Sequence, residues 1–333
     1  MNKHILIIRL SSFGDVAMTV PVISVFKNSH PKTKITILTT KFFSELFNQI
    51  PDINFLFFKE NHKTIFGLFL LKREIIKLEV DYIIDLHNVL RTNIIKFLLN
   101  SNIPFLRVNK GRNEKKKALN TGKLKKLKSM HQRYSDVFSD LKVNLDLEKF
   151  TAYKKVDISN SNYNFINSKK LVGIAPFAKH DSKEYSLENI LKIIDYLSSS
   201  VTIVLFGAKG EEESRLKHIA KERQNTFSVA GKLSLKDEMA VISNLDIMIS
   251  MDSANGHIAS LFGVNVISLW GATHPYLGYS PFGQPEENSI IADINKYPKI
   301  PVSIYGKNCP KEYINAINSI EVKDILKRIN EII

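Results

Sequence analysis

Along the first half of the chain, short apolar runs alternate with longer segments whose apolar residues recur at helical spacing. The runs predict strands at His4–Leu10, Lys34–Leu38, Asn54–Phe58, Tyr82–Asp85 and Phe105–Val108. The intervening segments predict helices at Val16–Asn28, Phe42–Gln49, Ile65–Glu79, Arg91–Asn100 and Met130–Leu141. Runs such as "ILII" and "YIID" lack alternation, as parallel strands covered on both faces do. Strands and helices in this order predict right-handed βαβ units in a doubly wound sheet.

A polar, Ser- and Asn-rich segment, Thr151–Lys169, then interrupts the pattern and is typical of a linker. Beyond it we expect strands at Leu171–Ala175, Val201–Phe206, Asp246–Ile249 and Asn265–Leu269. We expect helices at Leu187–Ser198, Glu211–Arg223, Leu235–Asn244, Ser253–Phe262 and Val322–Ile332. The pattern therefore predicts an α/β protein with two Rossmann-like domains, residues 1–155 and 170–320, facing a cleft. Ligands of such sheets bind beyond the carboxyl ends of strands, so the loops there are the candidate sites.

Composition narrows the class of protein. The chain has 333 residues, 44% of them hydrophobic and 10% aromatic, as in ordinary globular proteins. One cysteine, Cys309, excludes an internal disulfide and any Cys-rich metal site. The N-terminal apolar run is too short for a signal peptide, and "TIFGLFLL" (64–71) is far short of the ~20 residues that span a bilayer. These features predict a soluble cytoplasmic protein.

The formal net charge is +14, and part of the excess is concentrated between Gly111 and Lys128. That segment holds one acid, Glu114, and eight basic residues: Arg112, Lys115, Lys116, Lys117, Lys123, Lys125, Lys126 and Lys128. It could be a solvated loop, or a patch that binds anionic lipid headgroups or a phosphorylated acceptor. Nucleic acid fits less well, because no aromatic residues are interleaved and no nucleic-acid-binding motif is present.

Several common motifs are missing. No GxGxxG follows the first strand, and no GxxxxGK[ST] occurs, which argues against dinucleotide-binding and P-loop proteins. Neither HExxH nor an Asp-x-Asp pair is present, so we expect no metal.

Four loops that follow predicted strands hold the candidate groups: Ser11–Asp15, Ala175–Ser186, Phe206–Ser214 and Ser250–Pro275. Each candidate also has an ordinary structural role to set against a functional one. Asp15 and Asp252 could cap helices, and Lys183 could be an exposed loop lysine. Their joint occurrence at strand ends favours function.

The last of these loops resembles the C-terminal signature of glycosyltransferase family nine, the bacterial lipopolysaccharide heptosyltransferases. It reads "DSANGHIASLFG" from Asp252 and continues to "WGATHP" at Trp270–Pro275. Ala254 stands where the family usually has glycine, and His274 where it usually has aspartate. "SSFGDVAMTVP" from Ser11 is similar to the family's opening motif.

Two further loops carry the same resemblance. "APFAKHDSKEYS" from Ala175 resembles the family's "PGASxxxKxWP", with Phe177 in place of glycine. "DYIIDLHNVLRT" from Asp81 resembles a fourth motif, with His87-Asn88 in place of Gln-Gly. The tail motif is reduced to "GKNCP" at Gly306–Pro310.

The resemblance implies a glycosyltransferase-B fold, with acceptor in the first domain, donor in the second, and a C-terminal helix (321–333) packed back toward the first. The reaction would be inverting, metal-independent and cofactor-free transfer of heptose from ADP-heptose to the inner core of lipopolysaccharide or lipooligosaccharide, near Kdo-lipid A. The enzyme would then work as a monomer, peripheral at the cytoplasmic face of the inner membrane. It would contact an anionic lipid-linked glycan and no nucleic acid.

Residue roles follow from matched positions. Asp15 would be the general base, and Lys183 would meet the leaving diphosphate. Donor contacts are expected at Gly207, Glu211, Leu233, Asp252, Ser253, Ala254, Asn255, Gly256 and His257. Acceptor contacts are expected at Ser11, Ser12, Gly14, Arg91, Lys115, Lys116 and Lys117. Asp85, after the fourth strand, is the rival base.

Two alternatives remain: a glycosyltransferase of the same fold that uses another nucleotide sugar for a different cell-surface glycan, and a non-catalytic nucleotide-sugar-binding relative. The presence of both Asp15 and Lys183 disfavours the non-catalytic relative, because a protein that only binds the nucleotide sugar needs no base.

Overall fold

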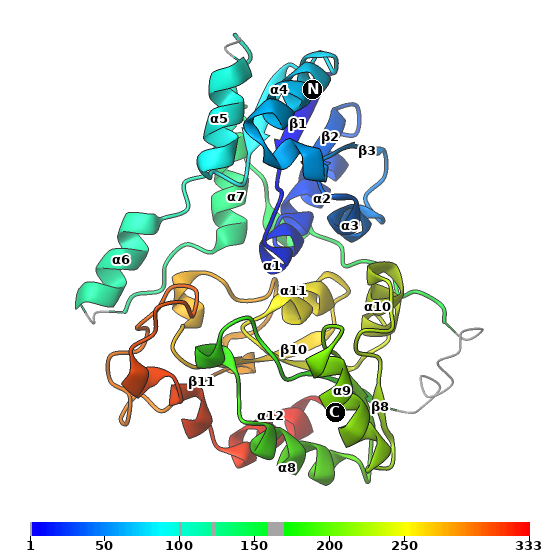
Figure 1. The fold of residues 1–333 in the computed structure, drawn as a ribbon, viewed down its shortest axis with the longest axis vertical. Helices are drawn as coiled ribbons and strands as arrows, with labels where there is room; N and C mark the ends of the chain where they lie inside the picture. Colours follow the sequence, from blue (N-terminus) through cyan, green and yellow to red (C-terminus); the bar gives the residue numbers. More distant parts are fainter. Residues whose placement is uncertain (1, 100–101, 122–123, 159–169) are drawn as a thin grey trace. The chain divides into compact units, whose positions relative to one another are not determined.

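The computed structural model describes residues 2–99, 102–121, 124–158 and 170–333. Contacts divide the chain into two compact units (Figure 1). The first unit is Met1–Lys110 with Met130–Thr151, and the second is Gly111–Ser129 with Ala152–Ile333. Each unit contains its own parallel sheet flanked by helices, which confirms the predicted pair of Rossmann-like α/β domains. The predicted linker lies largely outside the described residues.

The sheet of the first unit has the strand order β3-β2-β1-β4-β5, and every pairing is parallel. Its strands are β1 (His4–Ile8), β2 (Lys34–Thr39), β3 (Ile53–Phe57), β4 (Tyr82–Asp85) and β5 (Phe105–Arg107). In the central pair, Ile8 of β1 lies opposite Asp85 of β4. The loops after these two strands therefore leave the sheet side by side, at the edge where ligands bind in such folds.

Helices cover both faces of this sheet: α1 (Phe13–Ala17), α2 (Val20–Ser29), α3 (Lys41–Ser44), α4 (Ile65–Ile76), α5 (Leu90–Leu99) and α7 (Met130–Ser139). Leu6 and Ile8 pack with the inner sides of α4 and α5 in one apolar cluster. Phe26 of α2 meets Phe138 of α7 with ring centroids 4.6 Å apart. The predicted single helix from Val16 is two helices, since a new one begins at Val20 with proline in its first turn.

The sheet of the second unit has the order β11-β10-β9-β6-β7-β8. Its strands are β6 (Leu171–Ala175), β7 (Thr202–Leu205), β8 (Thr226–Ser228), β9 (Ile247–Met251), β10 (Asn265–Trp270) and β11 (Ser289–Ile291). The sequence prediction missed β8 and β11, because three-residue edge strands are too short to show a hydrophobic period. The central strands β6 and β9 end beside each other, with Ala175 opposite Ser250.

The helices of the second unit are α6 (Arg112–Thr121), α8 (Leu187–Leu197), α9 (Glu211–Lys221), α10 (Leu235–Ile242), α11 (Ala254–Leu261) and α12 (Val322–Ile332). Residues of α8, α9 and α12 share one apolar cluster with β6, β7, β9 and β10. Helix α11 packs on β9 and β10, and α10 packs on α11.

Two segments differ from the sequence prediction. Residues 111–129, placed in the first domain, belong by their contacts to the second unit. The C-terminal helix, expected to pack toward the first domain, instead buries Ile325 and Ile329 in the core of the second unit, against α8 and β10. Both corrections have the same cause: amphipathicity identifies the buried face of a helix but not which core receives it.

Candidate active site

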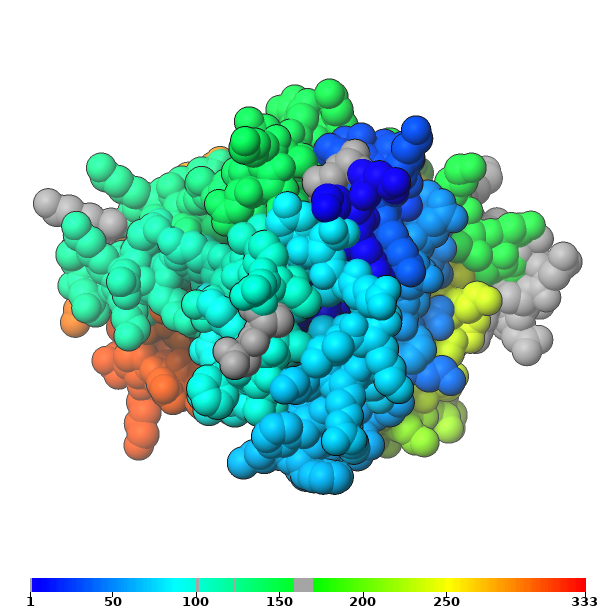
Figure 2. Space-filling view, turned by 90° about the horizontal axis from the view of Figure 1, so that it is seen from above, coloured from blue at the N-terminus to red at the C-terminus, as the bar shows by residue number. Residues whose placement is uncertain are grey.

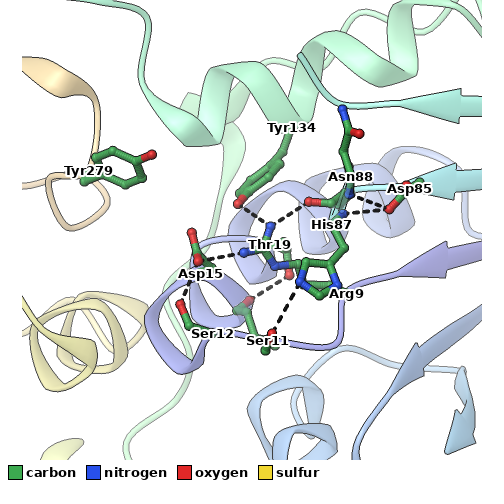
Figure 3. Close-up of polar contacts among 12 residues, drawn as sticks. Arg9, Ser11, Ser12, Asp15, Thr19, Asp85, His87, Asn88, Tyr134 and Tyr279 are labelled. Carbon is green, nitrogen blue, oxygen red and sulfur yellow. Dashed lines mark hydrogen bonds and ion pairs between the residues drawn. The ribbon is translucent and has the colours of Figure 1, made fainter. Parts of the chain in front are cut away.

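The loop after β1 places Asp15 beside a buried arginine. Arg9 directly follows β1 with its side chain only 2% exposed, and its Nη2 lies 2.7 Å from Asp15 Oδ2 (Figure 3). Its Nη1 donates to the Leu86 carbonyl at 2.6 Å and to the Tyr134 hydroxyl at 3.0 Å. Ser12 Oγ also donates to Asp15 Oδ2, at 2.6 Å. The Asp15 carboxylate, 26% exposed, is thus held from one side and open to solvent on another.

Neighbouring groups come from the loop after β4. Ser11 Oγ and His87 Nε2 are 3.3 Å apart (Figure 3). Burial, with added repulsion from Arg9 and Lys110, lowers the pKa of His87 to about 3, so its ring is neutral at physiological pH. Arg91, at the start of α5, places its guanidinium over the Phe58 ring, 5.1 Å from the centroid. Expected acceptor residues Ser11, Ser12 and Arg91 therefore lie on adjacent loops of one sheet edge.

Asp85, the rival base, is poorly suited to that role. Its side chain is fully buried, and Oδ1 accepts from the backbone amides of His87 at 2.9 Å and Asn88 at 2.8 Å. Burial raises the pKa of Asp85. This carboxyl shapes the loop after β4, including Asn88 at a positive φ of 42°, and leaves Asp15 as the accessible acid of the pair.

In the second unit, Lys183 and Asp252 form an ion pair that is largely shielded from solvent. Lys183 Nζ lies 2.5 Å from Asp252 Oδ2, with side chains 13% and 10% exposed. The Thr273 hydroxyl donates to the same carboxylate oxygen at 3.0 Å. The loops after β6, β9 and β10 thereby meet at one point, which brings together Lys183 and Asp252, two residues expected on the donor side. Lys183 is not a solvated loop lysine.

A glycine makes room for this lysine. Gly306, in the reduced tail motif, has φ of 82°, and a Cβ there would lie 2.8 Å from Lys183 Cε. Ser182 Oγ donates to the Gly306 carbonyl at 2.7 Å and fixes the two segments together. Any side chain at position 306 would both strain the backbone and displace the lysine.

The N-terminus of α11 lies beside this ion pair. Ser253 is its N-cap, and the Ser253 hydroxyl is buried with no hydrogen-bond partner among the residues described. Ala254 and Asn255 open the helix, and the Asn255 amide donates to Glu238 at 2.9 Å. Gly256 packs tightly on β9, since a Cβ there would lie 2.6 Å from Ser250 Oγ; His257 is buried. Amide groups and a positive helix end are thus available to an anion.

The loop after β7 exposes one carboxylate of three. Glu212 accepts from the Ala208 amide at 2.7 Å and Glu213 from the Gly210 amide at 3.4 Å, so both stabilise the loop. The Glu211 side chain is 87% exposed. Gly207, also expected at this site, accepts a hydrogen bond from the Gly231 amide at 3.1 Å. Leu233 is half-buried in the loop before α10.

The basic segment is a helix and an anchored tail, not a loop. Lys115 is fully buried, and its Nζ donates to the Tyr279 hydroxyl at 2.8 Å while lying 4.0 Å from the ring centroid. Lys126 pairs with Glu286, and the Leu127 amide donates to the Tyr276 carbonyl. Lys116 and Lys117 are exposed, and Lys123 lies outside the described residues. Lys115 is therefore an attachment of α6 to the second unit.

Sequence reasoning missed Arg9, Tyr134, Thr273 and Gly306. Arg9 could have been identified from the sequence, because a lone arginine in the apolar run "ILIIRL" needs a partner when it is buried. His274, a departure from the family pattern, accepts from the Tyr276 amide at 3.1 Å as a helix cap. Burial lowers the pKa of His274 to about 4.

Two searches of the described residues gave negative results. They contain no group of three or more His, Cys, Asp or Glu side chains arranged to hold a metal ion. Among the same residues, no helix has both the length and the apolar character needed to cross a bilayer.

Comparisons with known proteins agree with this geometry. The profile of glycosyltransferase family 9 (heptosyltransferase) matches residues 68–301. The lipopolysaccharide core heptosyltransferase OpsX of Haemophilus influenzae is 24% identical over 320 residues, covering 93% of this chain and 87% of that protein.

Solved structures show the same fold. A family 9 glycosyltransferase of Veillonella parvula superposes with a TM-score of 0.76 at 19% identity, covering 99% of this chain and 97% of that one. The heptosyltransferase WaaC of E. coli, solved with ADP, superposes with a TM-score of 0.68 at 16% identity, over 99% and 100% of the two chains. The fold is that of the glycosyltransferase-B enzymes, and the chain belongs to glycosyltransferase family 9, the heptosyltransferases.

Proposed function

We propose that this enzyme transfers heptose from ADP-heptose to the inner core of lipopolysaccharide or lipooligosaccharide, with inversion and without a metal. Two observations carry the proposal: the first unit presents an accessible carboxylate, Asp15, and the second unit holds a largely buried ammonium, Lys183, beside a helix N-terminus. The names of the relatives, a core heptosyltransferase and an enzyme solved with ADP, support the sugar and the nucleotide.

Asp15 is the group proposed to take the proton. Single-displacement transfer needs a base on the acceptor hydroxyl. The contacts from Arg9 and Ser12 both reach Oδ2 and fix the rotamer. With the side chain held in this way and 26% exposed, an acceptor hydroxyl can reach the carboxylate, and Ser11 and Arg91 lie in the same unit as the proposed acceptor contacts.

The donor side is proposed to meet the leaving diphosphate with protein charges. Lys183 and the amides at the start of α11 supply positive charge, and the Ser253 hydroxyl adds a donor. Asp252 holds Lys183 in place and has no reason to touch phosphate, since like charges repel. Glu211, exposed at the start of α9, suits the hydroxyls of a ribose.

The acceptor is proposed to be an anionic lipid-linked glycan at the cytoplasmic face of the inner membrane, reached by a monomeric enzyme. Lys116 and Lys117 are exposed lysines of α6 that could contact its phosphates or acidic sugars, whereas buried Lys115 could not without leaving Tyr279.

A nucleotide panel tests the donor. We expect ADP to raise the melting temperature more than UDP or GDP, and ADP-heptose to support transfer to Kdo-lipid A. Stabilisation by UDP or GDP instead would favour a transferase for another nucleotide sugar, and binding without any transfer would favour a non-catalytic relative.

A chelator tests the metal requirement. Transfer should proceed undiminished in EDTA, because Lys183 and the helix amides meet the diphosphate charge. Loss of activity in EDTA with recovery on adding magnesium would refute metal independence.

A further inference from the structure

Two neighbouring helices of the first unit carry apolar side chains on their outward faces. Of the twelve large hydrophobic side chains exposed in the described part of the chain, six lie on α4 and α5. They are 46–82% exposed: Ile65, Phe66, Phe69, Ile76, Leu90 and Phe97. We call these six residues the α4–α5 surface.

This surface is additional to the side of each helix that faces the core. Leu68, Leu71 and Ile75 of α4 are buried, as are Ile95 and Leu99 of α5. A helix on a globular surface normally turns polar residues outward. Helices α4 and α5 pack against each other, and Figure 2 shows their light-blue and cyan atoms side by side at the surface. Their outward apolar residues therefore form one patch, not scattered single exposures.

Basic side chains surround the patch. Residues 59–79 and 88–99 together contain seven Lys or Arg and three Glu. Two of the glutamates, Glu60 and Glu74, already pair with Lys63 and Lys59. Arg73, Lys77 and Lys96 are exposed on the same two helices as the phenylalanines.

Exposed apolar side chains together with basic side chains distinguish between two binding partners for this surface: a second copy of the chain and a lipid bilayer. A second copy of the chain meeting this face would bring two net-positive surfaces together, which is unfavourable. An anionic bilayer attracts the lysines and arginines and accepts phenylalanine at the level of its headgroups and upper acyl chains. We infer that the α4–α5 surface docks the enzyme on an anionic lipid bilayer.

The position of the α4–α5 surface in the fold relates the docking to the Asp15 site. Helix α5 begins at Leu90, two residues after Asn88 in the loop beside the Asp15 site, and α4 begins after the carboxyl end of β3. Arg91 over the Phe58 ring ties the start of α5 to the segment that connects β3 with α4. The apolar surface thus reaches the sheet edge that carries Asp15. That a lipid-linked acceptor would be presented there rests on the proposed function, but the docking itself does not.

The test is binding of the full chain to vesicles in a flotation assay without substrates. We expect binding to vesicles of phosphatidylethanolamine with phosphatidylglycerol, weak binding to phosphatidylcholine alone, and loss of binding in high salt. Phe66→Ser with Phe97→Ser should weaken binding by about tenfold or more, because each removes a phenyl ring from the apolar contact. Both side chains are mostly exposed, so folding should be unaffected.

Matched controls lie in the second unit. Phe227→Ser with Ile294→Ser removes two exposed apolar side chains elsewhere and should leave binding unchanged. Arg73→Gln with Lys77→Gln should weaken binding to the anionic vesicles. Lys217→Gln with Lys221→Gln, at the same spacing on α9, should not.

Three outcomes would overturn the inference: no binding of the unaltered enzyme to anionic vesicles at low salt, equal binding by the Phe66/Phe97 variant, or concentration-dependent dimerisation that this variant abolishes. Transfer to an acyl-free acceptor separates the two proposals. It should be unchanged in the Phe66/Phe97 variant, and its absence in the unaltered enzyme would count against the proposed reaction and not against docking.

Discussion

Among single residues, the contrast between Asp15 and Asp85 is the most informative. Asp85 ends β4 and Asp15 lies in the loop region after β1, at the same edge of one sheet. Two backbone amides donate to Asp85, whereas Arg9 and Ser12 hold one oxygen of Asp15. Burial raises the pKa of Asp85, so that group is also the harder of the two to keep charged. Their positions on the sheet make both acids candidates for the general base, and only their contacts distinguish them.

Replacement of Asp15 by asparagine tests the base. The variant keeps the shape of the side chain but cannot take a proton. We expect turnover to fall by ~10²–10⁴-fold with ADP affinity nearly unchanged, and the melting temperature to fall because buried Arg9 loses the charge of its ion-pair partner. If Asp15 served only to hold Arg9 in place, the melting temperature would fall in the same way, but the turnover of the folded variant would stay near that of the unaltered enzyme.

Lys183 is expected to serve both catalysis and stability, and a single substitution would change the two together. Lys183→Ala should lower turnover by ~10²–10³-fold, through loss of a charge on the leaving diphosphate. It should also lower the melting temperature, because Asp252 is left buried without its ion-pair partner. Adding Asp252→Asn should restore much of the stability and none of the rate. Recovery of both together would make Lys183 a structural residue alone.

At the scale of elements, the lysines of α6 differ in their exposure to solvent. Lys115 is buried on Tyr279, while Lys116 and Lys117 face solvent. Lys116→Ser with Lys117→Ser should raise the acceptor KM and reduce its salt dependence, leaving ADP affinity and melting temperature unchanged. Lys115→Ser should instead lower the melting temperature. An acceptor KM of Lys116/Lys117→Ser equal to that of the unaltered enzyme across a salt series would leave these lysines merely solvated.

Elements also show where sequence reasoning reaches its limit. The strands through His4–Ile8 and Ile247–Met251 were predictable from their apolar runs, and so were Asp15, Lys183 and Asp252 from their places after strands. The attachment of α6 and α12 to the second unit was not, because it depends on single contacts such as Lys115 with Tyr279. The role of Gly306 was not predictable either, since Lys183, whose side chain it makes room for, is over one hundred residues away in sequence.

At the scale of the whole molecule, each unit contains a buried histidine whose pKa lies far below the ordinary value: His87 in the first and His274 in the second. Burial lowers the pKa of His87 to about 3 and that of His274 to about 4, both below the ordinary value of 6.5. Below pH 6.5 the unfolded chain takes up these protons while the folded chain does not. The free energy of unfolding therefore decreases as pH falls from 6.5 toward 4, by up to about 1.4 kcal/mol per pH unit for each histidine.

Substitution of the two histidines tests this acid sensitivity. Gln stands at position 87 in the family pattern, and Asn at 274 can still cap the turn before Tyr276. In melting curves from pH 7.5 to 4.5, His87→Gln and His274→Asn should each lose less stability on acidification than the unaltered enzyme, and the double variant least. His218→Gln, at an exposed helix position, is the control and should leave the slope unchanged. If the curves of the three His87 and His274 variants ran parallel to that of the unaltered enzyme, the acid sensitivity would lie in other groups: the carboxylates, whose paired forms are likewise lost as pH falls, or His4 and His62, whose pKa burial also lowers.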